Sequence, residues 1–201
     1  MSINNPSFQG ASKPWKALII GAGIGGLSAG IALRSKGYDV EMIEKDASWT
    51  VYGVGIIQQN NVIRAMHELG VIDDYIGAGY GFDHVKIFAP NGMEVAKVPL
   101  PPLVDGYPAN AGIARPALQK VLAESAKKAG AAIRLGLTAT TISDTGDWVD
   151  VRFSDGSEGR YDLVIGADGI YSKTRGDIFP EAPKPEFTGQ SVWRYNFDRP
   201  A

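Results

Sequence analysis

The chain has 201 residues, a formal net charge of −2 and no cysteine. Its length is sufficient for a substantial core, and the near-balanced charge argues against nucleic acid or an anionic membrane as a partner. The lack of cysteine excludes disulfides, thiolate metal ligands and cysteine nucleophiles, and we expect no metal site. No apolar run approaches the roughly 20 residues of a membrane span. Residues 1–13 lack the layout of a signal peptide, so we expect a cytoplasmic protein with a flexible segment at residues 1–15.

The first predicted unit is a strand, a glycine turn and a helix within residues 16–44. The apolar residues 17–20 predict a buried strand, and Gly21, Gly23 and Gly26 then fill the three glycine positions of the G-x-G-x-x-G pattern. In that pattern the first glycine permits a tight turn, the second allows close approach of a pyrophosphate and the third lets the helix pack on the strand. The start of the helix offers free N–H groups to phosphate oxygens. The segment therefore predicts a dinucleotide site.

The residues that follow support this interpretation. Residues 27–36 predict a helix that ends at Gly37, and residues 39–43 predict a second strand with Glu44 at its carboxyl end. An acidic residue about 20 positions beyond the glycines is suited to accept hydrogen bonds from a ribose diol. The alternative for Glu44 is an ordinary solvated charge at the end of a strand.

A competing motif overlaps the same glycines. Residues 26–30 also match the G-x-S-x-G nucleophile elbow around Ser28. An elbow needs its serine at the strand-to-helix turn, whereas Ser28 is predicted to lie inside the helix. The sequence therefore disfavours a hydrolase.

The next segments frame the predicted dinucleotide site. Residues 48–59 show little periodicity and contain Gly53 and Gly55, so they predict a loop at the carboxyl edge of the sheet. Residues 61–69 predict a helix with Val62, Ala65, Met66 and Leu69 on its apolar face. His67 is expected on the outer face of that helix, without a catalytic role.

The middle of the chain changes character. Residues 84–98 predict a β-hairpin with Asn91-Gly92 at the turn, and the prolines of residues 99–102 predict a linker. Residues 114–129 predict a helix whose apolar stripe is Leu118, Val121, Leu122 and Ala126. Arg115 lies at the start of this helix, where it is either a surface cation or a contact to a ligand.

The last third returns to strands. Residues 133–137 predict a strand of the main sheet that continues extended to residue 142, and residues 148–161 predict a hairpin around Asp155-Gly156. Residues 162–169 resemble residues 17–23, because an apolar strand is followed by a turn that contains glycine. This arrangement predicts that Asp168 lies at the carboxyl edge of the sheet, where a ligand binds. The alternative is a common Asp-Gly turn without a ligand. The alternation of residues 191–197 predicts a final strand with Trp193, Tyr195 and Phe197 on one face.

Two motifs together carry a family resemblance. The glycine pattern with Glu44, and the sequence D-G-x-x-S-x-x-R from Asp168 to Arg175, resemble the amino-terminal half of single-component FAD-dependent aromatic hydroxylases, the flavin monooxygenases that include para-hydroxybenzoate and salicylate hydroxylases. The resemblance implies an α/β, Rossmann-like FAD-binding domain of the GR2 type with inserted β-strands of a partial substrate domain. In such enzymes NAD(P)H reduces the FAD, and O2 supplies the oxygen atom that enters a small aromatic or heteroaromatic substrate.

The resemblance also implies roles for individual residues. The cofactor-binding positions would be Gly21, Gly23, Gly25, Gly26, Glu44, Lys45, Gly55, Arg115, the backbone of Ala139, Asp168 and Gly169. Trp193, Arg194 and Tyr195 are candidates for the substrate pocket, although an ordinary half-buried sheet face is the favoured interpretation of their pattern. No catalytic base is identified.

The same resemblance divides the chain into segments. Residues 16–80 and 106–180 would form the FAD-binding domain, residues 81–105 a substrate-domain hairpin, and residues 181–201 the start of the substrate-domain sheet. The third family motif, G-D-A-A-H, does not occur in the chain. We therefore expect an amino-terminal half that needs its carboxyl-terminal half for tight FAD binding and for turnover, with that half or a second copy of the chain (a homo-oligomer) as the expected partner. Another flavoenzyme on the same scaffold, such as an epoxidase or reductase, and a non-catalytic nucleotide-binding module remain alternatives.

Overall fold

A four-stranded parallel sheet forms the centre of the computed structural model, which describes residues 14–193. The strands follow the order β12-β1-β2-β8 and pair in register, with Ala17 opposite both Leu163 and Val40. Their bounds are β1 (Lys16–Ile20), β2 (Asp39–Glu44), β8 (Ala132–Leu135) and β12 (Leu163–Gly166). The carboxyl ends of all four strands therefore meet at one edge of the sheet.

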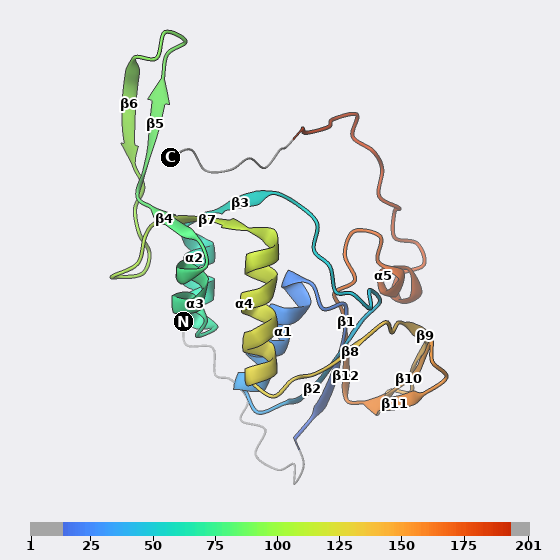
Figure 1. The fold of residues 1–201 in the computed structure, drawn as a ribbon. Helices are drawn as coiled ribbons and strands as arrows, with labels where there is room; N and C mark the ends of the chain where they lie inside the picture. The colour runs from blue at the N-terminus through green and yellow to red at the C-terminus, as the bar shows by residue number, and fades with distance from the viewer. Residues whose placement is uncertain (1–13, 194–201) are drawn as a thin grey trace, which may run out of the picture.

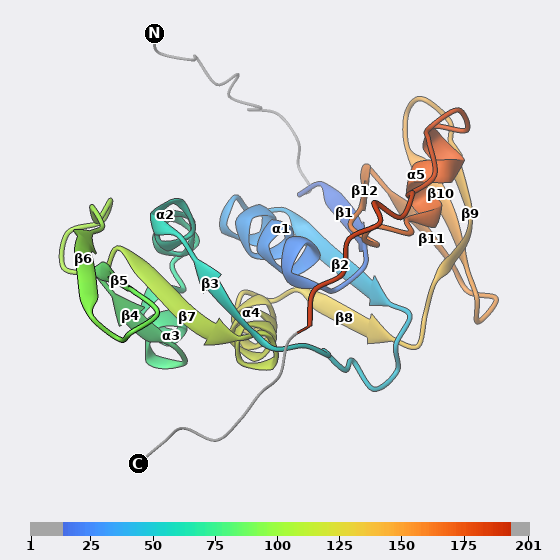
Figure 2. The same ribbon diagram turned by 90° about the horizontal axis from the view of Figure 1, so that it is seen from above.

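Both faces of this sheet are covered (Figures 1 and 2). Helices α1 (Ile24–Ser35) and α4 (Arg115–Lys128) cover one face, where Ile19 and Met42 join the larger core cluster. The antiparallel sheet of β9 (Ala139–Asp144), β10 (Val149–Phe153) and β11 (Glu158–Tyr161) covers the other face, where Leu18 and Ile43 join a second cluster. Successive residues of a strand point to opposite faces, which explains why β1 is apolar and buried at four successive positions, residues 17–20.

A buried ionic network ties the antiparallel sheet to β2. The Glu41 carboxylate accepts hydrogen bonds from the Tyr161 hydroxyl at 2.8 Å and from Arg134 Nη1 at 3.1 Å, and Lys16 Nζ lies 3.3 Å away. Burial alone would raise the pKa of Glu41, but these three partners outweigh it and lower the pKa below its usual value. These partners give the negative charge of Glu41, which lies between the two layers, the hydrogen bonds and opposite charges that it needs there.

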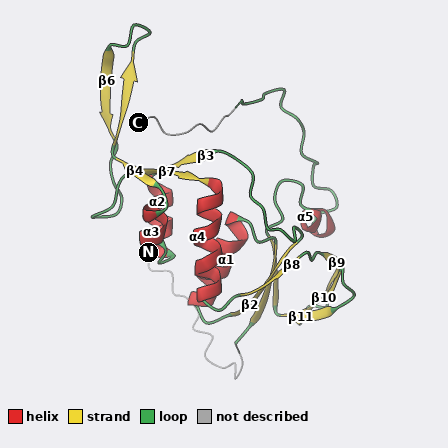
Figure 3. Ribbon diagram, viewed as in Figure 1, coloured by secondary structure: helices red, strands yellow, loops and turns green. Residues whose placement is uncertain are grey.

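The remaining elements extend to the side of the helical layer. A second antiparallel sheet has the order β3-β7-β4, and the β5–β6 hairpin projects from it, away from the rest of the molecule (Figures 1 and 3). The bounds are β3 (Gly55–Gln58), α2 (Asn60–Glu68), α3 (Ile72–Gly77), β4 (Tyr80–Phe82), β5 (His84–Phe88), β6 (Glu94–Pro99) and β7 (Asn110–Ala114). Helix α5 (Lys173–Ile178) lies at the opposite side of the molecule, beside β9 (Figure 1).

Most predicted elements are confirmed. The opening strand, helix and strand, the two hairpins, the helix of residues 114–129 and the strands at residues 133 and 163 all form. All four predicted stripe residues of α4 are buried. The extended segment after residue 137 also forms a strand, β9, but it leaves the parallel sheet and pairs with β10 instead.

Several expectations are wrong. The predicted loop of residues 48–59 contains β3, which pairs with the unpredicted strand β7, and α3 and β4 were likewise not predicted. On α2, Ile63 and Met66 are the buried residues, and Ala65 is exposed. The predicted residues Val62, Met66 and Leu69 do pack on the core, so the error is confined to Ala65, whose place on the covered face is taken by Ile63. The face of α2 that β7 and α3 cover includes Ile63.

The predicted final strand is only partly within the described residues. Residues 191–193 form no strand, and the side chain of Trp193 is 98% exposed. Residues 194–197 lie outside the described residues, as do residues 1–13 of the predicted N-terminal segment. The alternation in residues 191–193 therefore does not correspond to a half-buried sheet face within the part of the chain that the structure describes.

Candidate functional site

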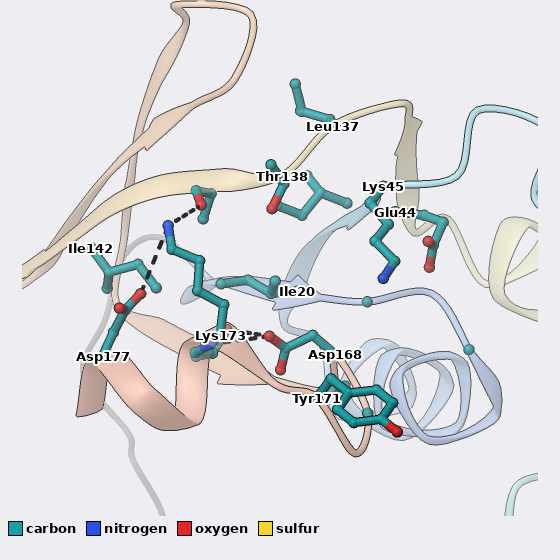
Figure 4. Close-up of a pocket in the computed structure, with 17 residues that line it drawn as sticks. Ile20, Glu44, Lys45, Leu137, Thr138, Ile142, Asp168, Tyr171, Lys173 and Asp177 are labelled. Carbon is teal, nitrogen blue, oxygen red and sulfur yellow. Dashed lines mark hydrogen bonds and ion pairs between the residues drawn. The ribbon is translucent and has the colours of Figure 1, made fainter. Parts of the chain in front are cut away.

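A cavity of about 320 Å³ opens at the carboxyl edge of the parallel sheet. It lies between the loops that follow β1, β2 and β12, with β9 and α5 at its far end (Figure 4). Seven of the predicted cofactor-binding residues line it: Gly21, Gly23, Glu44, Lys45, Ala139, Asp168 and Gly169. Residues far apart in the sequence therefore meet where an open parallel sheet is expected to hold its ligand.

The glycines of the first loop are needed for different physical reasons. A Cβ on Gly21 would lie 2.5 Å from the carbonyl oxygen of Ala167, and its φ of +103° disfavours other residues. A Cβ on Gly26 would lie 1.9 Å from the carbonyl oxygen of Gly21. By contrast, a Cβ on Gly23 would meet no protein atom within 4 Å, although Gly23 lines the cavity. The protein itself requires Gly21 and Gly26, whereas the space in front of Gly23 is open to a ligand.

Glu44 joins the glycine loop to the end of β2. Its Oε2 accepts a hydrogen bond from the Ala22 N–H at 3.0 Å, and its Oε1 accepts one from the Asp46 N–H at 3.0 Å. An ionised carboxylate has about four acceptor positions, so Glu44 can hold both loops and still accept from a ligand. Its side chain borders the cavity beside Lys45 (Figure 4).

Asp168 holds the loop after β12 and the start of α5. Its Oδ2 accepts hydrogen bonds from the Thr174 N–H and from the Thr174 hydroxyl, both at 3.0 Å, and its Oδ1 accepts a short one from the Ser172 hydroxyl. Partial burial acts to raise the pKa of Asp168, but the bonds from Ser172 and Thr174 outweigh it, so the pKa lies below its usual value. Ser172 in turn caps α5 by accepting from the Arg175 N–H.

We expect an Asp168→Asn substitution to lower the free energy of unfolding by about 1–3 kcal/mol, because an amide cannot accept all three of these hydrogen bonds. A carboxyl group whose pKa is lowered on folding stabilises above the unfolded-state pKa, and that contribution is lost as the pH falls through the folded-state pKa. Urea unfolding between pH 7 and pH 3 should therefore show a steeper loss of stability in the wild type than in the variant. Equal slopes would contradict this assignment.

Lys173 closes the end of the cavity near β9. Its Nζ donates to the backbone carbonyls of Ala139 and Thr140, each at 3.1 Å, and lies 4.0 Å from the Asp177 carboxylate (Figure 4). The Ala139 carbonyl therefore already has a partner. Leu137 and Ile142 give this end an apolar wall.

Sequence comparison decides the class of ligand for this site. Residues 15–194 match the FAD binding domain family. The chain belongs to this family. Its relatives include the aurachin C monooxygenase/isomerase of Stigmatella aurantiaca, which is 34% identical over 88% of this chain and 46% of its own length. The 3-amino-4-hydroxybenzoate 2-monooxygenase of Streptomyces cremeus is 29% identical over 88% of this chain and 44% of its own length.

A structural comparison agrees with the family. The tetrameric form of 2-methyl-3-hydroxypyridine-5-carboxylic acid oxygenase superposes with a TM-score of 0.70 at 28% identity, over 84% of this chain and 43% of that one. The chain spans about half the length of the curated relatives it matches. The predicted fold class, a Rossmann-like FAD-binding domain, is therefore confirmed, as is FAD as the cofactor of the family.

Not every predicted residue of this FAD binding domain lies at the cavity. Gly25 and Gly26 lie in the first turn of α1, and neither lines the cavity. Gly55 and Arg115 form a separate group, because Gly55 pairs with Ala114 across β3 and β7, and a Cβ on Gly53 would meet Arg115 Cδ at 2.8 Å. Trp193 contributes to no described pocket, and Arg194 and Tyr195 lie outside the described residues.

The nucleophile-elbow alternative has no support in the fold. Ser28 lies inside α1, after the glycine turn, as expected from the sequence.

Among the described residues, no helix is long and apolar enough to cross a membrane. No group of three or more His, Asp or Glu side chains in this part of the chain is placed to hold a metal ion.

Two residues at the site were missed by sequence reasoning. The Trp49 indole N–H and the Gln119 amide both donate to the carbonyl oxygen of Ala22, in the middle of the glycine loop. Trp49 lies in the segment predicted as an irregular loop and Gln119 in the predicted helix of residues 114–129, and neither was given a role. A tryptophan in a loop rich in polar residues was the one available signal.

Proposed function

We propose that the chain is the FAD-binding portion of an NAD(P)H- and O2-dependent flavin monooxygenase that hydroxylates a small aromatic or heteroaromatic substrate. The observation that carries this proposal is the cavity in which Gly23, Glu44 and the loop at Asp168 meet at the carboxyl edge of the parallel sheet. The names of the relatives give the reaction class, since both sequence relatives are monooxygenases and the structural neighbour is a hydroxypyridine carboxylate oxygenase.

The described residues fit an FAD molecule at three points. The open space at Gly23, at the N-terminus of α1, suits the pyrophosphate. Glu44 suits the adenosine ribose, with Lys45 beside it, and the apolar end at Ala139 suits the adenine. Asp168 and Gly169 would border the cofactor from the opposite loop, while Arg115 and Gly55 would approach the flavin end.

The bound FAD would supply the redox chemistry, and the protein would bind, orient and shield it. Residues 16–80 and 106–180 would form the FAD-binding domain. The β5–β6 hairpin projects from the body of the molecule (Figure 1), which supports assigning residues 81–105 to a substrate domain together with residues 181–201. The substrate-contacting and catalytic groups remain unassigned within the described residues.

Visible absorption after incubation with FAD and gel filtration tests the proposal. We expect flavin bands near those of bound FAD to elute with the complete protein, and NADH or NADPH to be consumed when a hydroxylated benzoate or pyridine carboxylate is added to it. A Glu44→Ala variant should bind FAD about tenfold more weakly, which is the scale of one or two charge-assisted hydrogen bonds. Glu158→Ala, which removes an exposed carboxylate paired with Arg152, is the matched control.

Retention of FAD without any NAD(P)H oxidation by the complete protein would favour a non-catalytic nucleotide-binding module. Oxidation of NAD(P)H without uptake of O2 would favour a reductase. A colourless complete protein that does not bind added FAD would contradict the proposal as a whole.

A further inference from the structure

The backbone of Ala22 is held on both sides by three side chains from separate parts of the chain. The Ala22 carbonyl oxygen accepts hydrogen bonds from Trp49 Nε1 at 2.9 Å and from Gln119 Nε2 at 2.7 Å. On the preceding peptide, the Ala22 N–H donates to Glu44 Oε2 at 3.0 Å. Ala22 itself is fully buried. Both sides of this residue are therefore fixed by side chains rather than by secondary structure.

The orientation of this carbonyl determines where the next N–H points. The described residues contain no cis peptide bond, and in a trans peptide the C=O and the following N–H point in opposite directions. Trp49 and Gln119 lie together on a groove of α4 and do not line the cavity, whereas Gly23 does. The Gly23 N–H therefore points away from these two donors, on the side of the loop that faces the cavity.

The backbone of Trp49 shows that its placement is enforced. Its φ of +49° is the one positive φ of a non-glycine residue among the described residues. Such a conformation costs energy and persists only where the surroundings impose it. Here Asp46 imposes it, because its carboxylate accepts from the N–H groups of Ser48 and Thr50 at 2.9 and 2.8 Å, and its carbonyl accepts from the Trp49 N–H. The turn delivers the indole N–H to the glycine loop.

Gln119 reaches the same oxygen from α4. Its side chain is 6% exposed, so the amide needs hydrogen-bonding partners within the protein. Gln119 lies 97 positions beyond Ala22 in the chain, so this bond links α4 to the first loop of the nucleotide unit. A leucine at this position would satisfy packing, and the amide is therefore specifically suited to hold the Ala22 carbonyl.

We propose that Trp49 and Gln119 are positioning residues that fix the Ala22–Gly23 peptide so that the Gly23 N–H faces a pyrophosphate in the cavity. The inference rests on the proposed function for the class of ligand, a dinucleotide such as FAD. Neither residue touches the cavity, so both would act through the peptide that they hold. The residues that determine phosphate affinity therefore extend beyond the glycine motif and Glu44.

The test compares Trp49→Phe, Gln119→Leu and the double variant with wild type. Phenylalanine keeps an aromatic ring beneath Lys127 and removes only the indole N–H. Trp148→Phe is the matched control, because it removes an indole N–H bonded to the exposed carboxylate of Asp150, away from the glycine loop. Three readouts are needed: the FAD dissociation constant, the 31P resonances of bound FAD, and hydrogen exchange without ligand of the Ala22 amide, which is buried and bonded to Glu44.

Each single substitution should raise the FAD dissociation constant about fivefold, and the double substitution about 25-fold, as expected for the loss of one and two hydrogen bonds. The 31P resonances should shift in the double variant, and its Ala22 amide should exchange at least about tenfold faster. A purely structural role would lower the melting temperature without moving the 31P resonances. Trp148→Phe should change none of the three readouts.

Two outcomes would overturn the inference: wild-type affinity and 31P resonances in the double variant, or the same losses in Trp148→Phe. If the double variant does not fold, the two single variants decide by the same readouts. A wild-type chain that does not bind FAD, combined with faster exchange of the Ala22 amide in the variants, would contradict the proposed function and still support the role of Trp49 and Gln119 in fixing the Ala22–Gly23 peptide.

Discussion

Replacing Gly26 with alanine is expected to unfold the nucleotide unit or to destabilise it severely. The added methyl carbon would lie 1.9 Å from the carbonyl oxygen of Gly21 and 3.3 Å from the Ile19 side chain. The Gly21 backbone cannot easily retreat, because its N–H donates to the Ile43 carbonyl at 2.8 Å and a Cβ at Gly21 would already clash with Ala167. We expect a loss of at least about 3 kcal/mol, at the upper end for overpacking, and a fall in melting temperature of roughly 6–12 °C.

The neighbouring glycine provides the control for this prediction. A Cβ on Gly25 would meet nothing within 4 Å, and Gly25 lies in the first turn of α1. Gly25→Ala should therefore stabilise the ligand-free protein by about 0.4–1 kcal/mol, because alanine loses less chain entropy on folding. Thermal unfolding of both variants without FAD checks the pair. Similar melting temperatures for the two variants would show that the contact between α1 and the glycine loop is not the constraint described above.

The nucleotide unit was predictable because its signals are local. The glycine spacing, the apolar strands around it and Glu44 lie within about 30 residues, and each predicts the same strand-turn-helix-strand unit. The loop at Asp168 was predictable for a similar reason, since D-G-x-x-S-x-x-R encodes a turn and a helix cap in eight residues. The two segments come together only because their strands lie in the same parallel sheet. This proximity was predicted from the rule that ligands bind at the carboxyl ends of parallel strands.

The elements that escaped prediction depend on partners elsewhere in the chain. Strand β3 has four residues and forms only because β7, more than 50 residues later, pairs with it. A four-residue segment with two glycine or polar members carries no periodicity of its own. On α2, the predicted face residue Ala65 is exposed and the buried Ile63 was not predicted, because neighbouring elements decide which side is covered. Trp49 and Gln119 belong to this group, since their shared acceptor exists only in the folded chain.

The three fingerprint glycines illustrate the difference between pattern and physical cause. In the sequence they are three glycines of one motif, and only the general pattern assigns each of them a role. In the fold Gly21 and Gly26 are required by backbone atoms of the protein, and they would be required whether or not a ligand binds. Gly23 is unconstrained by its neighbours. Substitution at Gly23 therefore separates ligand binding from folding.

Replacing Gly23 with valine is expected to abolish tight FAD binding in a protein that still folds. Gly23 has φ −79° and ψ −173°, an extended conformation that β-branched residues adopt readily. No protein atom lies within 4 Å of the new Cβ, so the ligand-free stability should change by less than about 1 kcal/mol. The valine methyl groups would occupy the space through which a pyrophosphate approaches the N-terminus of α1. We expect the FAD dissociation constant to rise at least about 100-fold, which corresponds to about 2.7 kcal/mol.

Fluorescence titration of FAD and thermal unfolding of the ligand-free chain, measured on the same preparation, check this separation. Gly92→Val is a poor control, because Gly92 has a φ of +83°, which valine rarely adopts. Gly112→Val is a better control. Its added Cβ also meets no atom within 4 Å, and Gly112 lies in β7, away from the cavity. That variant should keep FAD affinity within about twofold of wild type. Unaltered FAD binding by Gly23→Val would mean that the pyrophosphate does not pass over the glycine loop, and the assignment of the whole cavity to FAD would then fail with it.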